Sequence, residues 1–342
     1  MTGQDTRMRR EVAEIPQAVE RLLTDGAAAV RAAAAEIAHR DPAFFVTVAR
    51  GSSDHACTYF KYAAELLAGL PVASVGPSVA SIYGAKLKMA GAVCLSVSQS
   101  GRSPDIVDLT RAARTGGAYT VAVTNDAASP LAGAADATLD IHAGPELSVA
   151  ATKTFVTSAL ACLWVLAEMT GDTDLLAAIQ ALPGRLAEAV EADWSAVAGV
   201  VGEGSLYTLG RGPSWAISNE AALKFKEVCQ LHAESYSSAE VLHGPVSIVE
   251  RGFPVLAFSA ADAAEGPLAE VADALAGKGA LVFATTDRVR VAHALPTVRT
   301  GHPLTDPLSL IVSFYAMIER VAVSRGLDPD MPRHLRKVTE TT

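Results

Sequence analysis

The sequence predicts an α/β fold in which a domain with a parallel sheet occurs twice. Short apolar runs alternate with helical segments along most of the 342 residues, a pattern typical of parallel sheets covered by helices. The alternation stops near residue 170 and restarts near residue 200. Arg50-Gly51 and Arg211-Gly212 each follow the first apolar run of their half. The chain length suits about two domains, so we interpret the repeat as a duplication.

The first half begins with an amphipathic segment, in which Val12, Ile15 and Val19 follow helical spacing. Five short apolar runs then predict strands at 44–48, 72–75, 93–97, 119–123 and 137–141. Helices are expected at 54–67, from residue 104, and at 151–169. Helices between successive strands predict one parallel sheet with helices on both faces.

The second half repeats this pattern after an Ala- and Glu-rich helical stretch. Strands are expected at 206–209, 253–258, 281–285 and, shorter, at 295–298, with a closing helix at 306–324. We therefore divide the chain into an N-terminal helix, a first domain, a helical connector, a second domain and a C-terminal active-site tail, at 1–34, 35–170, 171–200, 201–330 and 331–342.

Composition excludes several classes of function. The net charge of −9 and the lack of a basic block argue against binding to nucleic acid or an anionic membrane. The N-terminus has no signal-peptide pattern, and the apolar helix at 155–169 is too short to span a bilayer. The four cysteines are scattered without a C-x-x-C motif, which predicts buried thiols rather than disulfides or zinc ligands. We expect a cytoplasmic protein.

A serine-rich loop follows the third apolar run. Residues 98–105 read Ser-Gln-Ser-Gly-Arg-Ser-Pro-Asp, with Ser103 at the N-cap and Pro104 at the first position of the next helix. Hydroxyl groups and free backbone N–H groups therefore meet in one loop, which suits a phosphate group and lacks the lysine of nucleotide-binding P-loops. An ordinary serine-rich turn is the alternative.

Three charged residues share one face of a predicted helix in the second half. Glu220, Lys224 and Glu227 have i, i+4, i+7 spacing. They indicate either a solvated face with ion pairs or a carboxylate base beside an ammonium that binds a developing oxyanion. His243 precedes Gly244-Pro245, where its ring can point into a cleft or make a local hydrogen bond. The charged residues at 331–340 are typical of a disordered end.

Taken together, these segments resemble the sugar isomerase (SIS) family of phosphosugar proteins. They are most similar to the isomerase half of glutamine:fructose-6-phosphate amidotransferase and to SIS-type glucosamine-6-phosphate deaminases. The motifs follow the family's order and spacing at 50–53, 98–101, 150–153, 220–227, 232–236, 240–245 and 335–339. The resemblance implies two flavodoxin-like SIS domains and a homodimer with its site near the subunit interface.

The resemblance also implies roles for individual residues. The positions that match the sugar 6-phosphate site are Ser53, Ser98, Gln99, Ser100 and Ser103. Glu227 matches the base that moves a proton between C1 and C2, and Lys224 matches its cationic neighbour. His243 matches the ring-opening histidine, which can reach a partner's site, and Lys337 matches the tail lysine that meets the carbonyl. Ala150 is expected at the pocket wall, and Arg336 replaces a small residue near the reacting end.

The expected function is an enzyme that deaminates and isomerises a hexosamine 6-phosphate, giving fructose 6-phosphate and ammonia. Acid–base groups suffice for this chemistry, so we expect neither a metal nor an organic cofactor. The sequence begins Met1-Thr2-Gly3 without a cysteine nucleophile, so no glutaminase activity is expected. Alternatives are dehydration of an N-acetylglucosamine 6-phosphate, deglycation of a sugar-phosphate amine adduct, and non-catalytic sensing of a phosphosugar.

Overall fold

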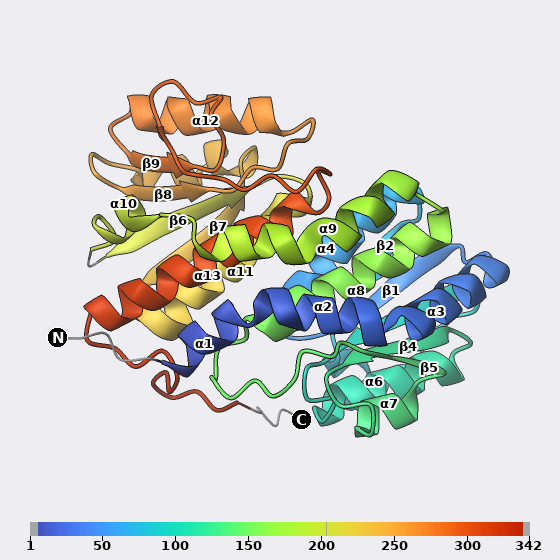
Figure 1. The fold of residues 1–342 in the computed structure, drawn as a ribbon. Helices are drawn as coiled ribbons and strands as arrows, with labels where there is room; N and C mark the ends of the chain where they lie inside the picture. Colours follow the sequence, from blue (N-terminus) through green and yellow to red (C-terminus); the bar gives the residue numbers. More distant parts are fainter. Residues whose placement is uncertain (1–5, 203, 338–342) are drawn as a thin grey trace. The chain divides into compact units, whose positions relative to one another are not determined.

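The computed structural model describes residues 6–202 and 204–337, and the chain divides into two compact units with one sheet each (Figure 1). The first-sheet unit combines residues 17–146 and 153–180 with the chain from Arg336 onward. The second-sheet unit combines the N-terminal residues through Pro16 with residues 147–152 and 181–335. The predicted α/β fold with two parallel sheets is confirmed, and the five-part division of the chain stays a prediction.

The first-sheet unit contains five parallel strands in the order β2-β1-β3-β4-β5. The strands are β1 (Phe44–Val48), β2 (Val72–Ser74), β3 (Ala92–Val97), β4 (Tyr119–Thr124) and β5 (Ala137–Asp140). The helices are α2 (Ile15–Asp25), α3 (Ala27–Arg40), α4 (Ser52–Leu67), α5 (Ser78–Ser81), α6 (Pro104–Thr115), α7 (Pro130–Ala134) and α8 (Lys153–Thr170).

Side chains that alternate along β1 explain why helices cover both faces of this sheet. Val46 and Val48 pack with Ile106 and other residues of α6. Phe45 points to the opposite face, where its ring meets Phe60 of α4 edge to face at 5.0 Å. A strand that is buried on both faces reads as a continuous apolar run, which is why the sequence signal was strong here.

The second-sheet unit has the order β10-β9-β8-β6-β7, also entirely parallel. Its strands are β6 (Ser205–Gly210), β7 (His232–Ser237), β8 (Pro254–Ala257), β9 (Leu281–Ala284) and β10 (His293–Ala294). Its helices are α1 (Arg7–Ala13), α10 (Ser195–Ala198), α11 (Pro213–Cys229), α12 (Glu265–Gly277) and α13 (Asp306–Ser324), with 3₁₀ turns η1 (Glu240–Leu242) and η2 (Pro245–Ile248). Helix α9 (Thr173–Val190) contributes residues to both units.

Counted from the first strand of each sheet, both units have the doubly wound order 2-1-3-4-5. The glycines that begin the first helix of each repeat also match. Gly51 has φ 56° and ψ −133°, and Gly212 has φ 58° and ψ −138°. This left-handed φ favours glycine, so both Arg-Gly pairs mark the same turn. The predicted duplication is therefore confirmed.

Two predictions in the second half were wrong or incomplete. The strand expected at 295–298 is absent, and β10 ends at Ala294, because Pro296 lacks the N–H group that a sheet ladder needs. Strand β7 was missed, because Ala233 is its one fully buried residue and the alternating apolar signal is lost.

The N-terminal segment, expected as a single helix, contains α1, α2 and the start of α3. All four cysteines are buried and free, as predicted. Within the described ranges, α13 is long and apolar enough to cross a membrane by composition, but 78% of that stretch is buried, as in the core helix of a globular unit.

Candidate functional site

The first-sheet unit has a cavity at the point where its strand order reverses. The connections that leave β1 and β3 run in opposite directions, which opens a crevice at the carboxyl ends of these two strands. A cavity of about 320 Å³ lies there. The structure places six predicted residues together along it, namely Ser53, Ser98, Gln99, Ser100, Ser103 and Lys337.

The loop after β3 keeps its hydroxyl groups available to a ligand. Ser103 is the N-cap of α6 and Pro104 its first residue, as predicted, yet the Ser103 side chain makes no capping hydrogen bond. The Ser98 and Ser100 oxygens accept the N–H groups of Gly101 and Arg102, at 3.2 and 3.3 Å. A hydroxyl that accepts a hydrogen bond can still donate one, so both serines can bind an anion.

Lys337 reaches this cavity from the C-terminal tail and pairs with a buried carboxylate. Its Nζ lies 2.7 Å from Oε2 of Glu146, whose side chain is fully buried. Glu146 also accepts hydrogen bonds from the N–H and Oγ1 of Thr154, at 3.1 and 2.6 Å. This set of bonds holds the ammonium at the cavity wall. The predicted tail continues through residues 338–342, which lie outside the described residues.

Two other predicted residues do not line this cavity. Arg336 is exposed, next to Lys337 in the chain. Ala150 is buried and belongs to the segment 147–152 of the second-sheet unit.

The three charged residues of α11 form a buried cluster in the second-sheet unit. Lys224 has no exposed surface and lies 3.0 Å from Glu220 and 2.6 Å from Glu227. The Tyr315 hydroxyl donates to Glu220 at 3.0 Å. The alternative of a solvated face with surface ion pairs is therefore wrong. Glu227 keeps 20% of its side chain exposed, so it is the member of the cluster that can meet a ligand.

The pKa of Lys224 shows how this cluster is balanced. Burial by itself lowers the pKa of the ammonium, but the carboxylates of Glu220 and Glu227 outweigh burial and raise it above its ordinary value. The two carboxylates thus favour the charged form of Lys224. Because it is fully buried, it can act on a ligand only through Glu227, rather than by binding an oxyanion directly as the spacing suggested.

His243 caps the 3₁₀ turn η1 and is exposed, in the same unit. Its backbone N–H donates to the Glu240 carbonyl at 2.9 Å. The ring is therefore on the surface of this chain.

Sequence reasoning missed two charged residues of the first cavity. Arg50 lines it, and Nε of Arg50 donates to buried Asp105 at 2.5 Å. Glu146 holds Lys337. The sequence marked Arg50 as part of the repeat and of the motif at 50–53 but assigned it no role in binding, although its position directly after the first strand indicates the switch point.

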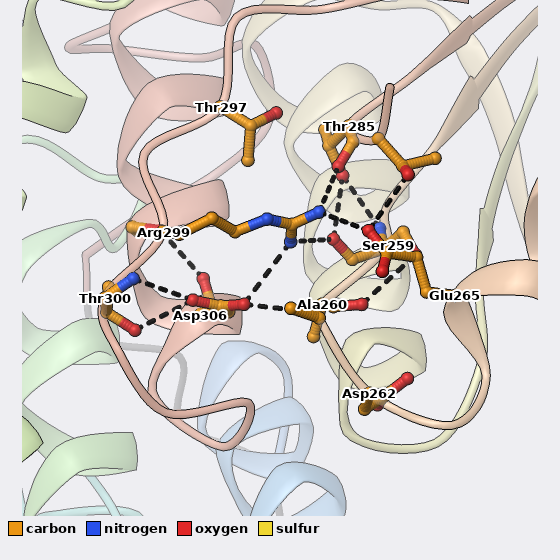
Figure 2. A network of polar contacts seen from close by, with 12 residues as sticks. Ser259, Ala260, Asp262, Glu265, Thr285, Thr297, Arg299, Thr300 and Asp306 are labelled. Atoms are coloured by element: carbon orange, nitrogen blue, oxygen red, sulfur yellow. Dashed lines mark hydrogen bonds and ion pairs between the residues drawn. The ribbon is translucent and has the colours of Figure 1, made fainter. Parts of the chain in front are cut away.

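In the second sheet, an arginine from the same unit is enclosed by acceptor groups at the carboxyl ends of β8 and β9 (Figure 2). Nη2 of Arg299 lies 2.6 Å from Glu265, and its Nη1 lies 3.3 Å from Asp306. The same guanidinium donates to the carbonyls of Ser259 and Thr285, at 2.8 and 3.3 Å. Two carboxylates and two carbonyls therefore surround a cation at this end of the second sheet.

Comparison with known proteins agrees with this duplicated architecture. The SIS domain family matches residues 42–169 and 201–294. Glutamine–fructose-6-phosphate aminotransferase [isomerizing] of Aeropyrum pernix is 35% identical over 310 residues, covering 85% of this chain and 50% of the relative. The chain thus spans about half the length of the curated relatives it matches.

Two solved structures share the fold over nearly the whole chain. A candidate phosphosugar isomerase from Silicibacter pomeroyi is 67% identical, with a TM-score of 0.93 over 95% of this chain and 100% of the other. Glucosamine-6-phosphate deaminase of Thermotoga maritima has a TM-score of 0.80 at 19% identity, over 98% of this chain and 100% of the other. The chain belongs to the SIS domain family, with one SIS domain in each half.

Proposed function

We propose that this chain is an enzyme that enolises a hexosamine 6-phosphate between C1 and C2, as a glucosamine-6-phosphate deaminase that forms fructose 6-phosphate and ammonia. The observation that carries the proposal is the cavity at the first switch point. It gathers four serines and Gln99 around Arg50 and Lys337, and none of the described residues that line it carries a carboxylate. Hydroxyl, amide and cationic donors of this kind suit a phosphate dianion.

The roles of the remaining residues follow from their exposure and charge. Lys337 can donate to the sugar carbonyl oxygen while Glu146 holds it in place. Glu227 takes the C2 proton, and the buried ammonium of Lys224 holds this carboxylate in position. His243, exposed on its 3₁₀ turn, assists ring opening, in our proposal at the site of a second copy of the chain in a homodimer.

The reaction balances without an oxidant or reductant. Glu227 removes the proton at C2 of the open-chain amino aldose, and the carbonyl oxygen is protonated, giving an enolamine. Return of a proton to C1 leaves an imine at C2. Water then adds to that imine and releases ammonia, so the product is the 2-ketose. Every step is a proton transfer or a hydrolysis, which acid–base groups can carry.

The test is incubation with a panel of hexosamine 6-phosphates and their N-acetyl and N-alkyl derivatives, followed by mass spectrometry. Release of ammonia from glucosamine 6-phosphate supports the proposal. Loss of water from the N-acetyl sugar would indicate a dehydratase, release of a substituted amine a deglycase, and binding without any conversion a sensor. The Glu227→Gln variant, prepared in parallel, controls for contaminating enzymes.

A second candidate is a sugar-phosphate isomerase that interconverts an aldose and a ketose without losing nitrogen. Its support is the 67% identity to the Silicibacter pomeroyi protein, together with the isomerizing aminotransferase relatives. Isomerisation changes no mass, so the assay is repeated in deuterium oxide, where enolisation adds one deuterium at C1 or C2. Deuterium uptake without ammonia would favour this candidate.

A further inference from the structure

We infer that Arg50 binds the ligand and makes the first cavity selective for a dianionic phosphate ester over a monoanionic ester of the same shape. This inference rests on the proposed function, which places a phosphate group in that cavity. Arg50 is the single arginine among the described residues that line it. The predicted phosphate site, by contrast, contained only hydroxyl and amide groups.

The position of Arg50 leaves its donor groups available. The side chain is 45% exposed and is held from one side by Asp105, which has no exposed surface. Asp105 accepts the Nε hydrogen at 2.5 Å. A guanidinium has five donors in a planar fork, so the terminal Nη groups can still meet two phosphate oxygens.

The carboxylate of Asp105 also explains why phosphate binding needs a cation at the position of Arg50. It is the second residue of α6, the helix whose first turn would bind the phosphate. A carboxylate there competes with a phosphate for the same N–H groups and repels it. Arg50 forms an ion pair with that carboxylate. Removal of the Arg50 side chain would therefore weaken phosphate binding in two ways: donor groups are lost, and the negative charge of Asp105 repels the phosphate more strongly.

The same arrangement occurs at Lys337. In both ion pairs the cation lines the cavity, whereas the carboxylates of Asp105 and Glu146 are not among the lining residues. Each pair therefore presents its positive end to the ligand. Lys337 is assigned to the carbonyl end of the sugar, which leaves Arg50, beside Ser53 and the loop after β3, for the phosphate end.

Charge selectivity separates this role from a structural one. A sugar phosphate carries nearly two negative charges above its second pKa of about 6, whereas a sulfate ester of similar shape carries one. A cation in contact with the ester binds the phosphate more tightly than the sulfate. A residue that only supports the fold would affect both esters equally.

The experiment is calorimetric titration with glucitol 6-phosphate and glucitol 6-sulfate, which have no carbonyl group and therefore do not turn over. Because a hydrogen bond to a charged group contributes about 1.5–3 kcal/mol, Arg50→Gln should weaken phosphate-ester binding roughly 10- to 100-fold. Sulfate-ester binding should fall much less, so the phosphate preference narrows. Arg50→Lys should restore part of the preference, since it keeps the charge but loses the fork.

Arg102→Gln is the matched control. Arg102 lies in the same loop and pairs with Asp126 at 3.2 Å, but it does not line the cavity. The Arg102→Gln variant should bind the phosphate ester and the sulfate ester with unchanged affinity. If Arg50→Gln does not fold, Arg50→Gln combined with Asp105→Asn removes the guanidinium without leaving a buried charge, and the same narrowing is expected.

An equal loss for both esters, or no loss, would overturn the inference while leaving the proposed function standing. The inference would also be overturned if Arg102→Gln weakened phosphate-ester binding as much as Arg50→Gln does. The preference for the phosphate ester would then come from the overall positive charge near the loop rather than from contact with Arg50. If the parent protein binds neither ester, the proposed function fails and this inference fails with it.

Discussion

The two sheets of this protein share one strand order, but different polar groups lie at their carboxyl ends. At the carboxyl ends of β1 and β3, a serine-rich loop and two cations surround an open cavity. At the equivalent end of the second sheet, Arg299 contacts Glu265, Asp306 and two carbonyl groups. The first cavity offers donors to an anion, whereas the acceptors at the carboxyl ends of β8 and β9 are already paired with a cation from the same unit.

Two domains with the same fold therefore need not share the same binding site. The strand order of a doubly wound sheet produces a crevice at its switch point. The residues of the surrounding loops determine whether that crevice can bind a ligand. In our proposal the first unit binds the phosphate, and the second supplies the acid–base cluster of α11. Four predictions, given in order of decreasing size, test this division.

Glu227→Gln should lower kcat by about 10² or more, because a general base is lost, while binding of glucitol 6-phosphate changes little. The measurement is steady-state turnover together with deuterium exchange at C1 and C2. Glu250→Gln, an exposed carboxylate in the same unit, is the control. Exchange that persists in Glu227→Gln would mean that another residue is the base, and the division of roles would be wrong.

Arg299→Gln should lower the free energy of unfolding by about 2–4 kcal/mol, because two buried carboxylates lose a partly exposed cation. Denaturant unfolding measures this effect. Arg299→Lys should recover part of the loss. Phosphate-ester affinity should survive in the folded variant, which is the reverse of the expectation for Arg50→Gln. A stable Arg299→Gln variant that no longer bound the ester would show that the cluster around Arg299 also takes part in binding.

Ser100→Ala should weaken phosphate-ester binding by about an order of magnitude, the effect of one hydrogen bond to a charged oxygen, with the fold intact. Ser259→Ala changes a serine in the loop that follows β8, whose Oγ donates to the Ala260 carbonyl at 3.4 Å. It should leave the affinity unchanged. Similar losses of phosphate-ester affinity in Ser100→Ala and Ser259→Ala would show that the two sheets do not differ in phosphate binding.

Asp262→Asn should slightly stabilise the protein at neutral pH. Burial raises the pKa of Asp262, and the nearby carboxylates of Glu265 and Asp306 raise it further. The folded state therefore holds this proton more tightly, so the parent loses stability as pH rises from the ordinary aspartate value of about 4 through the raised one.

The asparagine side chain does not titrate, so the variant should be no more stable than the parent below about pH 4. Above the raised pKa of Asp262, the variant's free energy of unfolding should exceed the parent's by at most about 1 kcal/mol, because solvent screens the charge. Thermal unfolding across the pH range measures the difference. An advantage that is constant with pH would show that the carboxylate charge is not its cause.

Elements and chemistry that depend on neighbouring residues are predictable from the amino-acid sequence alone. Buried strands such as β1 and β3 are continuous apolar runs, and Ser103-Pro104 marks the start of α6, because burial and helix capping act on neighbouring residues. The spacing of Glu220, Lys224 and Glu227 likewise predicted their shared helix face, because the helical period sets which side chains are neighbours.

Ion pairs between distant parts of the chain are seen only in the folded protein. Arg50 and Asp105 are 55 residues apart, and Glu146 and Lys337 are 191 apart, so no local pattern links them. Strand β7 lacks an apolar signal, and its parallel pairing with β6 makes it a strand. The pairing of Arg299 with Glu265 is also absent from any local pattern, because ion pairing depends on distance in space rather than on separation in sequence.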